Sequence, residues 1–142
     1  MTIAAILDGK GRDVVSIDAD QSVTQAASLL AERRIGAVPV MRDGTVAGIF
    51  SERDVIYCLA NDGAAALDRP VSDVMTAPAI TVGPGESVLA ALALMTQRRI
   101  RHLPVVEGGR CIGLVSIGDL VKYRIDRIEA EAEAMRSYIQ TA

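Results

Sequence analysis

Two Ser-x-x-Asp corners are the residues of this chain best suited to chemistry. Ser51 and Asp54 stand in "GIFSERDV", and Ser116 and Asp119 stand in "GLVSIGDL". A serine where a strand enters a helix can donate to a phosphate oxygen, and the free N–H groups at that helix end also favour an anion. An aspartate one turn into the helix can accept hydrogen bonds from two neighbouring hydroxyls, as on a ribose. Each corner is a candidate holder for a ribose phosphate.

A simpler interpretation of the same corners remains open. Serine followed three residues later by an acidic residue resembles a helix capping box, in which both side chains satisfy backbone groups and no ligand is involved. Gly48 and Gly113 precede the two corners. A glycine there carries no side chain, so we expect it to leave room for a ligand to approach the strand closely.

The chain is an internal repeat. Shifted by 65 residues it matches itself without a gap, with "SVTQAASLLAERRIGAVPV" over "SVLAALALMTQRRIRHLPV" and "RDGTVAGIFSERDV" over "EGGRCIGLVSIGDL". Repetition of this kind indicates that one structural unit is used twice. The identical pairs include Ser22/Ser87, Arg33/Arg98, Arg34/Arg99, Ile35/Ile100, Pro39/Pro104, Gly44/Gly109, Gly48/Gly113, Ser51/Ser116 and Asp54/Asp119.

Each unit predicts the element order β-α-β-β-α. The first strands are expected at residues 14–17 and 79–82, and Ser22 with Gln25 predicts a capped helix between the first and second strands. The Gly-containing stretches "RDGT" and "EGGR" predict hairpin turns between the second and third strands. The helices are expected to end in solvated arginine pairs, at 33–34 and 98–99.

One unit holds too few strands to bury its own sheet, so we expect the two to pack on each other. The predicted fold is α/β (α+β): two tandem β-α-β-β-α repeats packed sheet to sheet with pseudo-twofold symmetry, followed by a long C-terminal helix. The expected division is a first repeat at 1–62, a linker at 63–70, a second repeat at 71–126 and a helical extension at 127–142.

Composition narrows the class of protein. The net charge is −3, whereas nucleic-acid-binding domains are usually basic, so we expect no nucleic-acid partner. Two cysteines are too few for a disulfide framework, and a single histidine argues against a zinc site. No signal peptide is recognised at the N-terminus, and the longest apolar run, Val88–Met95, is too short to span a bilayer. We expect a cytoplasmic protein that has no metal and is not bound to a membrane.

The ordered set of motifs resembles the cystathionine-β-synthase-type (CBS) domain pair, also called a Bateman module. Both units carry Pro-Val on the second strand, at Pro39 and Pro104, and Gly-apolar-apolar-Ser-x-x-Asp at the last corner. The resemblance covers roughly Val14–Tyr123 and implies two tandem CBS repeats. It also implies binding of adenosine nucleotides, namely AMP, ADP, ATP or NAD, in clefts between the repeats.

The resemblance assigns roles to individual residues. Asp54 and Asp119 are expected to hold ribose hydroxyls, and Ser51 and Ser116 to approach phosphate or ribose. The adenine is expected in an apolar slot formed by the first strand and the start of the second. That slot comprises Ile80, Thr81 and Ile100 in one cleft and Val15, Ser16, Ile35 and Ala37 in the other, with Pro39 and Pro104 on the adjoining strands.

The same resemblance predicts that the two clefts are unlike. Arg101 and His102, just before "Leu-Pro", match a His/Arg pair that reaches the phosphates in related modules, although here the order is reversed. The first repeat has Gly36 and Ala37 at the matching positions. Arg53 lies inside the first corner, whereas the second has Gly118 there. One cleft is therefore expected to bind nucleotide more tightly, or the two to prefer different nucleotides.

The C-terminal stretch carries apolar residues at alternating spacings of four and three: Val121, Ile125, Ile128, Ala132, Met135 and Ile139. This spacing is a heptad seam. Either the helix packs on its own module or, as we expect, it pairs across a homodimer.

The expected function is a regulatory module that senses energy or redox state through an adenosine nucleotide, changes conformation on binding it and signals to an unknown protein partner. It is not expected to be an enzyme, and no catalytic residue or catalytic cofactor is assigned. The alternatives are a dimerisation scaffold without a ligand and a small nucleotide hydrolase. A recognisable P-loop or nucleophile–base pair would favour the hydrolase, and the sequence offers neither.

Overall fold

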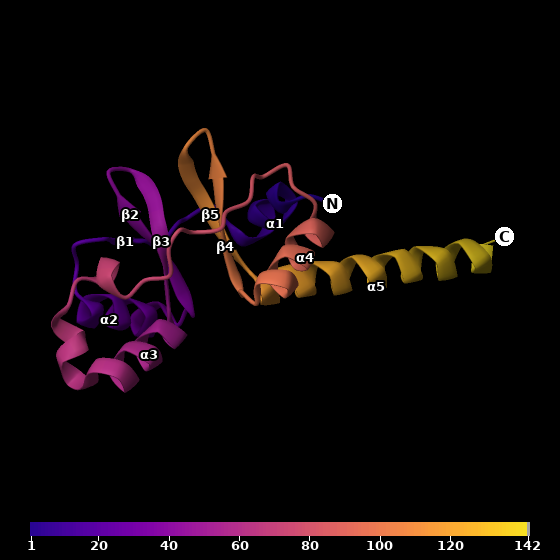
Figure 1. Ribbon diagram of the computed structural model, residues 1–142. Coiled ribbons are helices and arrows are strands. Elements are labelled where there is room, and N and C mark those ends of the chain that lie inside the picture. Colours follow the sequence, from indigo (N-terminus) through magenta and orange to yellow (C-terminus); the bar gives the residue numbers. More distant parts are fainter. Residues whose placement is uncertain (142) are drawn as a thin grey trace.

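A computed structural model describes residues 1–141, and its elements follow the predicted repeat (Figure 1). In the first repeat β1 runs parallel to β2, which pairs antiparallel with β3. Helix α2 connects β1 to β2, and α3 follows β3. The elements are β1 Ile17–Asp18, α2 Val23–Arg33, β2 Ala37–Arg42, β3 Thr45–Ser51 and α3 Glu52–Asp62.

The second repeat has the same order with a smaller sheet. Its β4 and β5 form an antiparallel hairpin, and Val82 adds a single parallel bridge to Val105. Two 3-10 turns, η1 and η2, connect the repeats, and η1 spans most of the predicted linker. The elements are η1 Gly63–Asp68, η2 Val71–Asp73, α4 Val88–Arg98, β4 His102–Glu107, β5 Arg110–Ser116 and α5 Ile117–Thr141.

The expected first strands are much shorter than predicted. Residues 14–17 enter the sheet only at Ile17, and residues 79–82 only at Val82. Val82 nevertheless exchanges two backbone hydrogen bonds with β4, donating to Pro104 at 3.0 Å and accepting from Val106 at 2.9 Å. The fold class is confirmed. Each first segment pairs with its sheet only at its last residues, and the residues before them lie outside the sheet.

Local sequence explains where the helices begin and end. Ser22 accepts from the Gln25 N–H at 3.1 Å, while the Gln25 side chain accepts from the Ser22 N–H at 2.9 Å, so the predicted capping box is present. Arg34 and Arg99, which end α2 and α4, adopt the left-handed conformation with φ of 53° and 54°. That turn breaks the helix and directs the chain into β2 or β4.

A helix at the N-terminus, α1 (Ile3–Lys10), packs on the second repeat although it precedes the first in sequence. Ile3, Ile6 and Leu7 are buried in the core that contains Leu103 and Val105. The chain then crosses to the first repeat, whose separate core is centred on the fully buried Phe50 and Val38. Helix α1 therefore brings N-terminal residues to the second corner.

The two hairpins lie side by side at the centre of the molecule, with β3 next to β5, and α5 projects well beyond the rest of the fold (Figure 1). This arrangement places both Ser-x-x-Asp corners at the junction of the repeats. Helix α5 continues without a break through the predicted boundary at residue 126. Within residues 1–141, none of the helices combines the length and apolar character needed to cross a membrane.

Candidate functional site

An open cleft of about 390 Å³ lies between the two repeats, and we call it the first cleft. The first repeat contributes its Ser-x-x-Asp corner, and the second repeat contributes the segment before β4. Its walls are Gly36, Ile49, Ser51, Glu52, Arg53, Asp54, Tyr57, Thr76, Pro78, Ala79, Ile80, Arg99, Ile100, Arg101 and His102. Seven residues predicted to bind nucleotide therefore share one cavity: Ser51, Arg53, Asp54, Ile80, Ile100, Arg101 and His102.

The carboxylate of the first corner both caps its helix and lines the cleft. Asp54 Oδ2 accepts from the Ser51 N–H at 2.8 Å, and Ser51 Oγ accepts from the Asp54 N–H at 3.4 Å, so the capping box is complete. The Ser51 hydroxyl also donates to Oδ2 at 3.2 Å. Its other oxygen, Oδ1, accepts from the Thr76 hydroxyl at 3.1 Å. Each carboxylate oxygen can accept about two hydrogen bonds, so Oδ2 is filled and Oδ1 has one site left. A second site becomes free if the Ser51 or Thr76 hydroxyl turns toward a ligand, and the Ser51 N–H still keeps the cap.

The wall opposite the corner is apolar. Ile80 and Ile100 of the second repeat are partly buried and pack against its core, and Pro78 and Ala79 complete the surface. An apolar wall and a carboxylate in one cleft suit a ligand that is apolar at one end and carries hydroxyls at the other. Two other residues predicted for this region do not line the cleft: Thr81 is exposed, and Pro104 is buried within β4.

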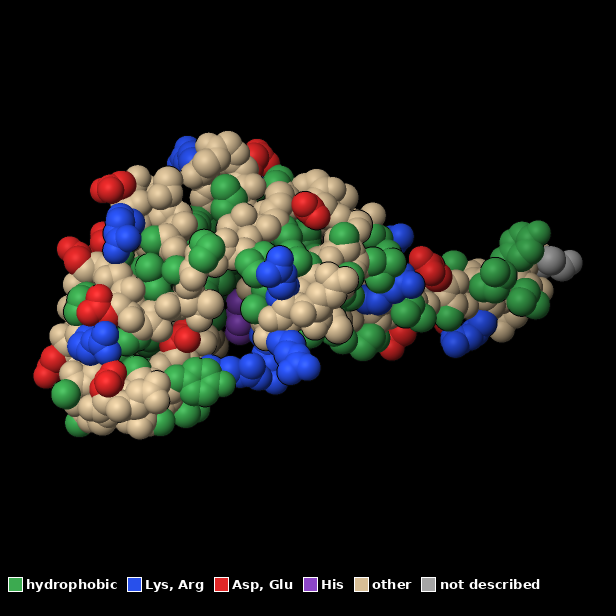
Figure 2. All heavy atoms as spheres, viewed as in Figure 1, with side chains coloured by type: hydrophobic (Ala, Val, Ile, Leu, Met, Phe, Trp, Pro, Cys, Tyr) green, Lys and Arg blue, Asp and Glu red, His purple; other side chains and the backbone are tan. Residues whose placement is uncertain are grey.

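Cations line the rest of the first cleft. Arg53, Arg99 and Arg101 contribute side chains, and none of them forms an ion pair with any of residues 1–141. Figure 2 shows the single histidine in a recess of the surface with Lys and Arg side chains gathered below it. Unpaired guanidinium groups are well suited to hold phosphate oxygens.

His102 lies where the two repeats meet. A Cβ added to Gly36 would lie 3.4–3.5 Å from the imidazole, an ordinary contact distance, so the ring lies directly beside the first repeat at this glycine. Burial, which has the largest effect, and the nearby Lys10 lower the pKa of His102, although Asp119 and Glu52 act in the opposite direction. Because an ordinary histidine has a pKa near 6.5, His102 is mostly neutral at pH 7.

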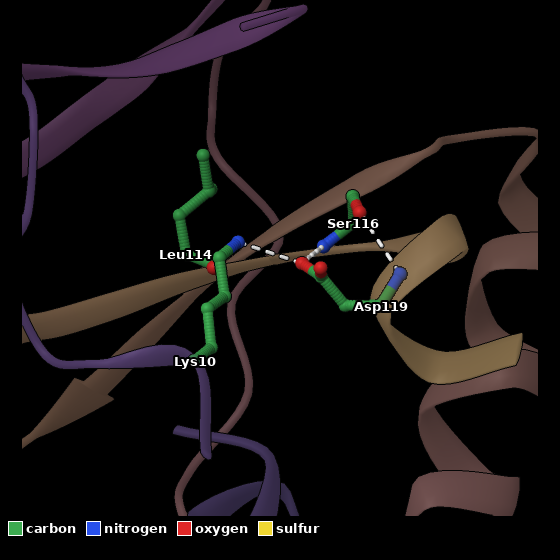
Figure 3. Close-up of polar contacts among 4 residues, drawn as sticks. All are labelled: Lys10, Leu114, Ser116 and Asp119. Carbon is green, nitrogen blue, oxygen red and sulfur yellow. Dashed lines mark hydrogen bonds and ion pairs between the residues drawn. The ribbon is translucent and has the colours of Figure 1, made fainter. Parts of the chain in front are cut away.

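The second corner has the same internal geometry but a different neighbour. Asp119 Oδ2 accepts from the Ser116 N–H at 2.9 Å and also from Lys10 Nζ at 2.6 Å, and Lys10 reaches the Leu114 carbonyl at 2.8 Å (Figure 3). Burial raises the pKa of Asp119, but the hydrogen bonds from Lys10 and Ser116 together outweigh it, so the pKa lies below its usual value. An ammonium group already holds this carboxylate.

The slot predicted for the other cleft lies on the first repeat. Val15 and Ile35 are partly buried and pack against the first core, and Ser16 is exposed. Ala37 and Pro39 are buried in β2. These residues stand 65 positions before Ile80, Thr81, Ile100, His102 and Pro104, so the repeat places them as the counterpart of the first cleft's wall. Their role in ligand binding stays a prediction.

The glycines before the two corners have a role different from the expected one. A side chain on Gly48 would meet the Met75 sulfur and the Thr76 carbonyl oxygen, both at 2.7 Å, and one on Gly113 would meet Leu7 at 2.6 Å. The groups that lie close to these two glycines are therefore other residues of the protein and not a ligand. The expectation that these glycines leave room for a ligand is wrong, because α1 and the segment before residue 78 occupy that space.

Several residues at the two corners were missed by sequence reasoning. Thr76, Tyr57 and Glu52 carry no motif, and Arg99 was assigned to a solvated helix end, yet all four line the first cleft. Lys10 lies 109 residues from Asp119. The 65-residue offset could have pointed to one of these five residues, Lys10. It aligns Thr76 with Gly11, and Lys10 directly precedes Gly11.

Comparison with known proteins identifies the architecture. A family model for the CBS domain matches residues 11–61 and again 71–126. The chain belongs to the CBS domain family. A CBS-domain-containing protein of Agrobacterium tumefaciens, ATU1752, has a similar solved structure, with a TM-score of 0.84 and 43% identity over 87% of this chain and 99% of that one. The predicted CBS pair is therefore confirmed.

Two further CBS proteins resemble this chain. The chain is similar to the CBS domain-containing protein CBSX3, mitochondrial, of Arabidopsis thaliana, with 34% identity over 98% of this chain and 72% of the relative. The CBS pair of protein MJ0100, solved in complex with 5-methylthioadenosine and S-adenosylmethionine, shares the fold at a TM-score of 0.79 and 22% identity, over 89% of this chain and 98% of that one. MJ0100 thus holds adenosine-containing ligands on this fold.

Proposed function

We propose that this CBS pair is a regulatory sensor that binds an adenosine-containing ligand in the first cleft and releases it unchanged. The observation that carries the proposal is the first cleft itself, where the Asp54 carboxylate, an apolar wall and unpaired arginines from two repeats line a common space, with Glu52 beside them. These three features match the sugar diol, the base and the phosphate of a nucleotide. The ligands found in MJ0100 support the adenosine moiety.

The proposed roles follow the chemistry of each wall. Asp54 accepts the two ribose hydroxyls, and the adenine lies against Ile80 and Ile100. Arg101 and Arg53 hold the phosphate, since their guanidinium groups form no ion pair within residues 1–141. The candidate ligands are AMP, ADP, ATP and NAD, together with S-adenosylmethionine on the precedent of MJ0100.

Ligand binding becomes a signal through the junction of the repeats. The first cleft takes its walls from both repeats, so a bound ligand favours the relative arrangement in which both sets of contacts form. A ligand shifts such an equilibrium only by its differential affinity for the two arrangements. The change in arrangement is then transmitted to a protein partner.

A cytoplasmic location remains a prediction.

Titration calorimetry with AMP, ADP, ATP, NAD and S-adenosylmethionine tests the proposal. We expect saturable binding of at least one of them, with the ligand recovered unchanged by chromatography. Turnover of ATP by the purified protein would instead favour the hydrolase. No heat from any of the five, together with no ligand carried through gel filtration, would favour the scaffold.

Affinity for AMP is expected to rise a few-fold as the pH falls from 8 to 6.5. His102 is mostly neutral in the free protein because burial and Lys10 lower its pKa. A bound phosphate raises that pKa again, so binding takes up a proton, and by linkage binding tightens as protons become more available. Calorimetry across this pH range measures the change. Adenosine, which has no phosphate, and His102→Gln should both show a flat profile, and a flat profile for AMP with the wild type would contradict the role of His102.

We also infer that α5 pairs with a second copy of the chain. Its apolar residues remain strongly exposed, with Ile125 and Ile128 at 49%, Met135 at 62% and Ile139 at 67%. The far end of the helix projects away from the module, so its own repeats do not cover it (Figure 1). Sedimentation should find a dimer that Met135→Glu combined with Ile139→Glu converts to monomer. A monomeric wild type would contradict the inference.

A further inference from the structure

The two corners differ in what holds the carboxylate, and the difference depends on one residue. In the first repeat, Thr76 makes two contacts: its N–H donates to the Ile49 carbonyl at 2.8 Å and its hydroxyl donates to Asp54 at 3.1 Å. Ile49 and Asp54 correspond, 65 residues on, to Leu114 and Asp119. In the second repeat a single group, Lys10 Nζ, makes both equivalent contacts.

The sequence explains this exchange. The position that corresponds to Thr76 is Gly11, which has no side chain to donate. Gly11 also ends α1 with φ of 102°, so Lys10 is the last helical residue. Ile3 and Leu7, both buried in the second core, fix the helix that carries it. The ammonium group thus reaches Asp119 from a helix anchored in the second core, and Figure 3 shows its contact with the carboxylate.

A hydroxyl partner leaves the negative charge of a carboxylate unpaired, whereas an ammonium partner forms an ion pair with it. Thr76 is neutral, so Asp54 keeps its full charge for sugar hydroxyls. Lys10 neutralises Asp119 and shares Oδ2 with the Ser116 N–H. Asp119 Oδ1 accepts no hydrogen bond from residues 1–141, so one sugar hydroxyl can bind there, but a diol that binds both carboxylate oxygens needs the place that Lys10 holds on Oδ2. An uncharged diol takes that place only by separating the ion pair, whose side chains are partly exposed.

We propose that Lys10 is a built-in competitor for the sugar of a ligand at Asp119, so that the chain binds its adenosine ligand first at Asp54 and only weakly at the second corner. This inference rests on the proposed function, because it supposes that the corners hold sugar hydroxyls. It assigns to α1 a role in ligand selection, in addition to its role in the second core.

The test measures adenosine binding by calorimetry in an Asp54→Asn background, where the first cleft is weakened and the second corner dominates. Adenosine carries no phosphate, so loss of the lysine charge does not weaken binding through the ligand's own charge. We expect Lys10→Met in this background to raise the affinity for adenosine by about three- to tenfold, the range for losing a partly exposed ion pair and a second hydrogen bond. Adding Asp119→Asn should remove the gain.

Arg12→Met is the matched control. Arg12 belongs to the same segment but pairs with Asp8 at 3.2 Å, so its loss removes one positive charge without freeing Asp119. We expect no gain from it. An unchanged or lower affinity after Lys10→Met, with wild-type protein that binds adenosine, would overturn the role of Lys10 alone. If the wild type binds AMP but neither it nor the Lys10→Met variant binds adenosine, the role of Lys10 is again overturned alone. If neither protein binds adenosine, AMP, ADP, ATP, NAD or S-adenosylmethionine, the proposed function is overturned as well.

Discussion

Asp54→Asn is expected to weaken AMP binding by about 30- to 100-fold while the unliganded protein keeps its stability. Hydrogen bonds to a charged acceptor contribute about 1.5–3 kcal/mol each, and about 1.4 kcal/mol corresponds to a tenfold change in affinity. The asparagine oxygen can still accept from the Ser51 N–H, so the helix cap survives. The amide nitrogen then replaces the oxygen that faces Thr76, which turns an acceptor of sugar hydroxyls into a donor.

Asp119→Asn provides the matched control, since it makes the same chemical change at the second corner. Its effect on the affinity of the first cleft should stay within about threefold, because Asp119 hydrogen-bonds Lys10 and Ser116 and does not line that cleft. Calorimetry gives the affinities and thermal unfolding gives the stability. If Asp54→Asn sharply lowered the melting temperature and left AMP binding intact, the corner would be a capping box and nothing more.

Gly48→Ala is expected to destabilise the protein by about 1–3 kcal/mol, the usual range for forcing extra volume into a packed site. The added carbon would lie 2.7 Å from the Thr76 carbonyl oxygen, which is backbone and accepts a hydrogen bond from the Ile49 N–H at 2.9 Å. The segment therefore has to move, and the Thr76 hydroxyl moves with it. AMP affinity should fall as well, because Thr76 contacts Asp54.

Gly113→Ala is the matched control for Gly48→Ala, because Gly113 is the corresponding glycine of the second repeat. There the added carbon meets only the end of the Leu7 side chain, at 2.6 Å, and a leucine can change rotamer more easily than a backbone can shift. Chemical denaturation should show a smaller loss of stability, with AMP affinity at the first cleft unchanged. Equal losses in the two variants would mean that the contact with Thr76 has no special importance.

The features predicted correctly from sequence are those encoded locally or repeated. The capping box at Ser22, the hairpins and the break after Arg98 depend on a few neighbouring residues, and the 65-residue offset revealed the duplication. The expectation of clefts between the repeats came from the resemblance to the CBS pair, but which aspartate shares a cleft with Ile100 and His102 was not predicted. Without that resemblance, no local pattern brings together residues from two different repeats.

The features that were missed depend on contacts distant in sequence. Helix α1 packs on the second repeat through Ile3 and Leu7, and no periodicity in the first ten residues indicates which core receives them. Lys10 reaches Asp119 as a consequence of that packing. The strand expected at residues 79–82 failed for a related reason: only Val82 lies close enough to β4 to pair, and a β-rich composition does not say where pairing begins.

The most direct test of the account is a crystal structure of the protein grown or soaked with AMP. The account predicts AMP in the first cleft, with both ribose hydroxyls about 2.6–3.2 Å from the Asp54 carboxylate and the adenine against Ile80 and Ile100. A first cleft left empty in the crystal although AMP binds the protein in solution, or AMP bound with its ribose away from Asp54, would contradict it.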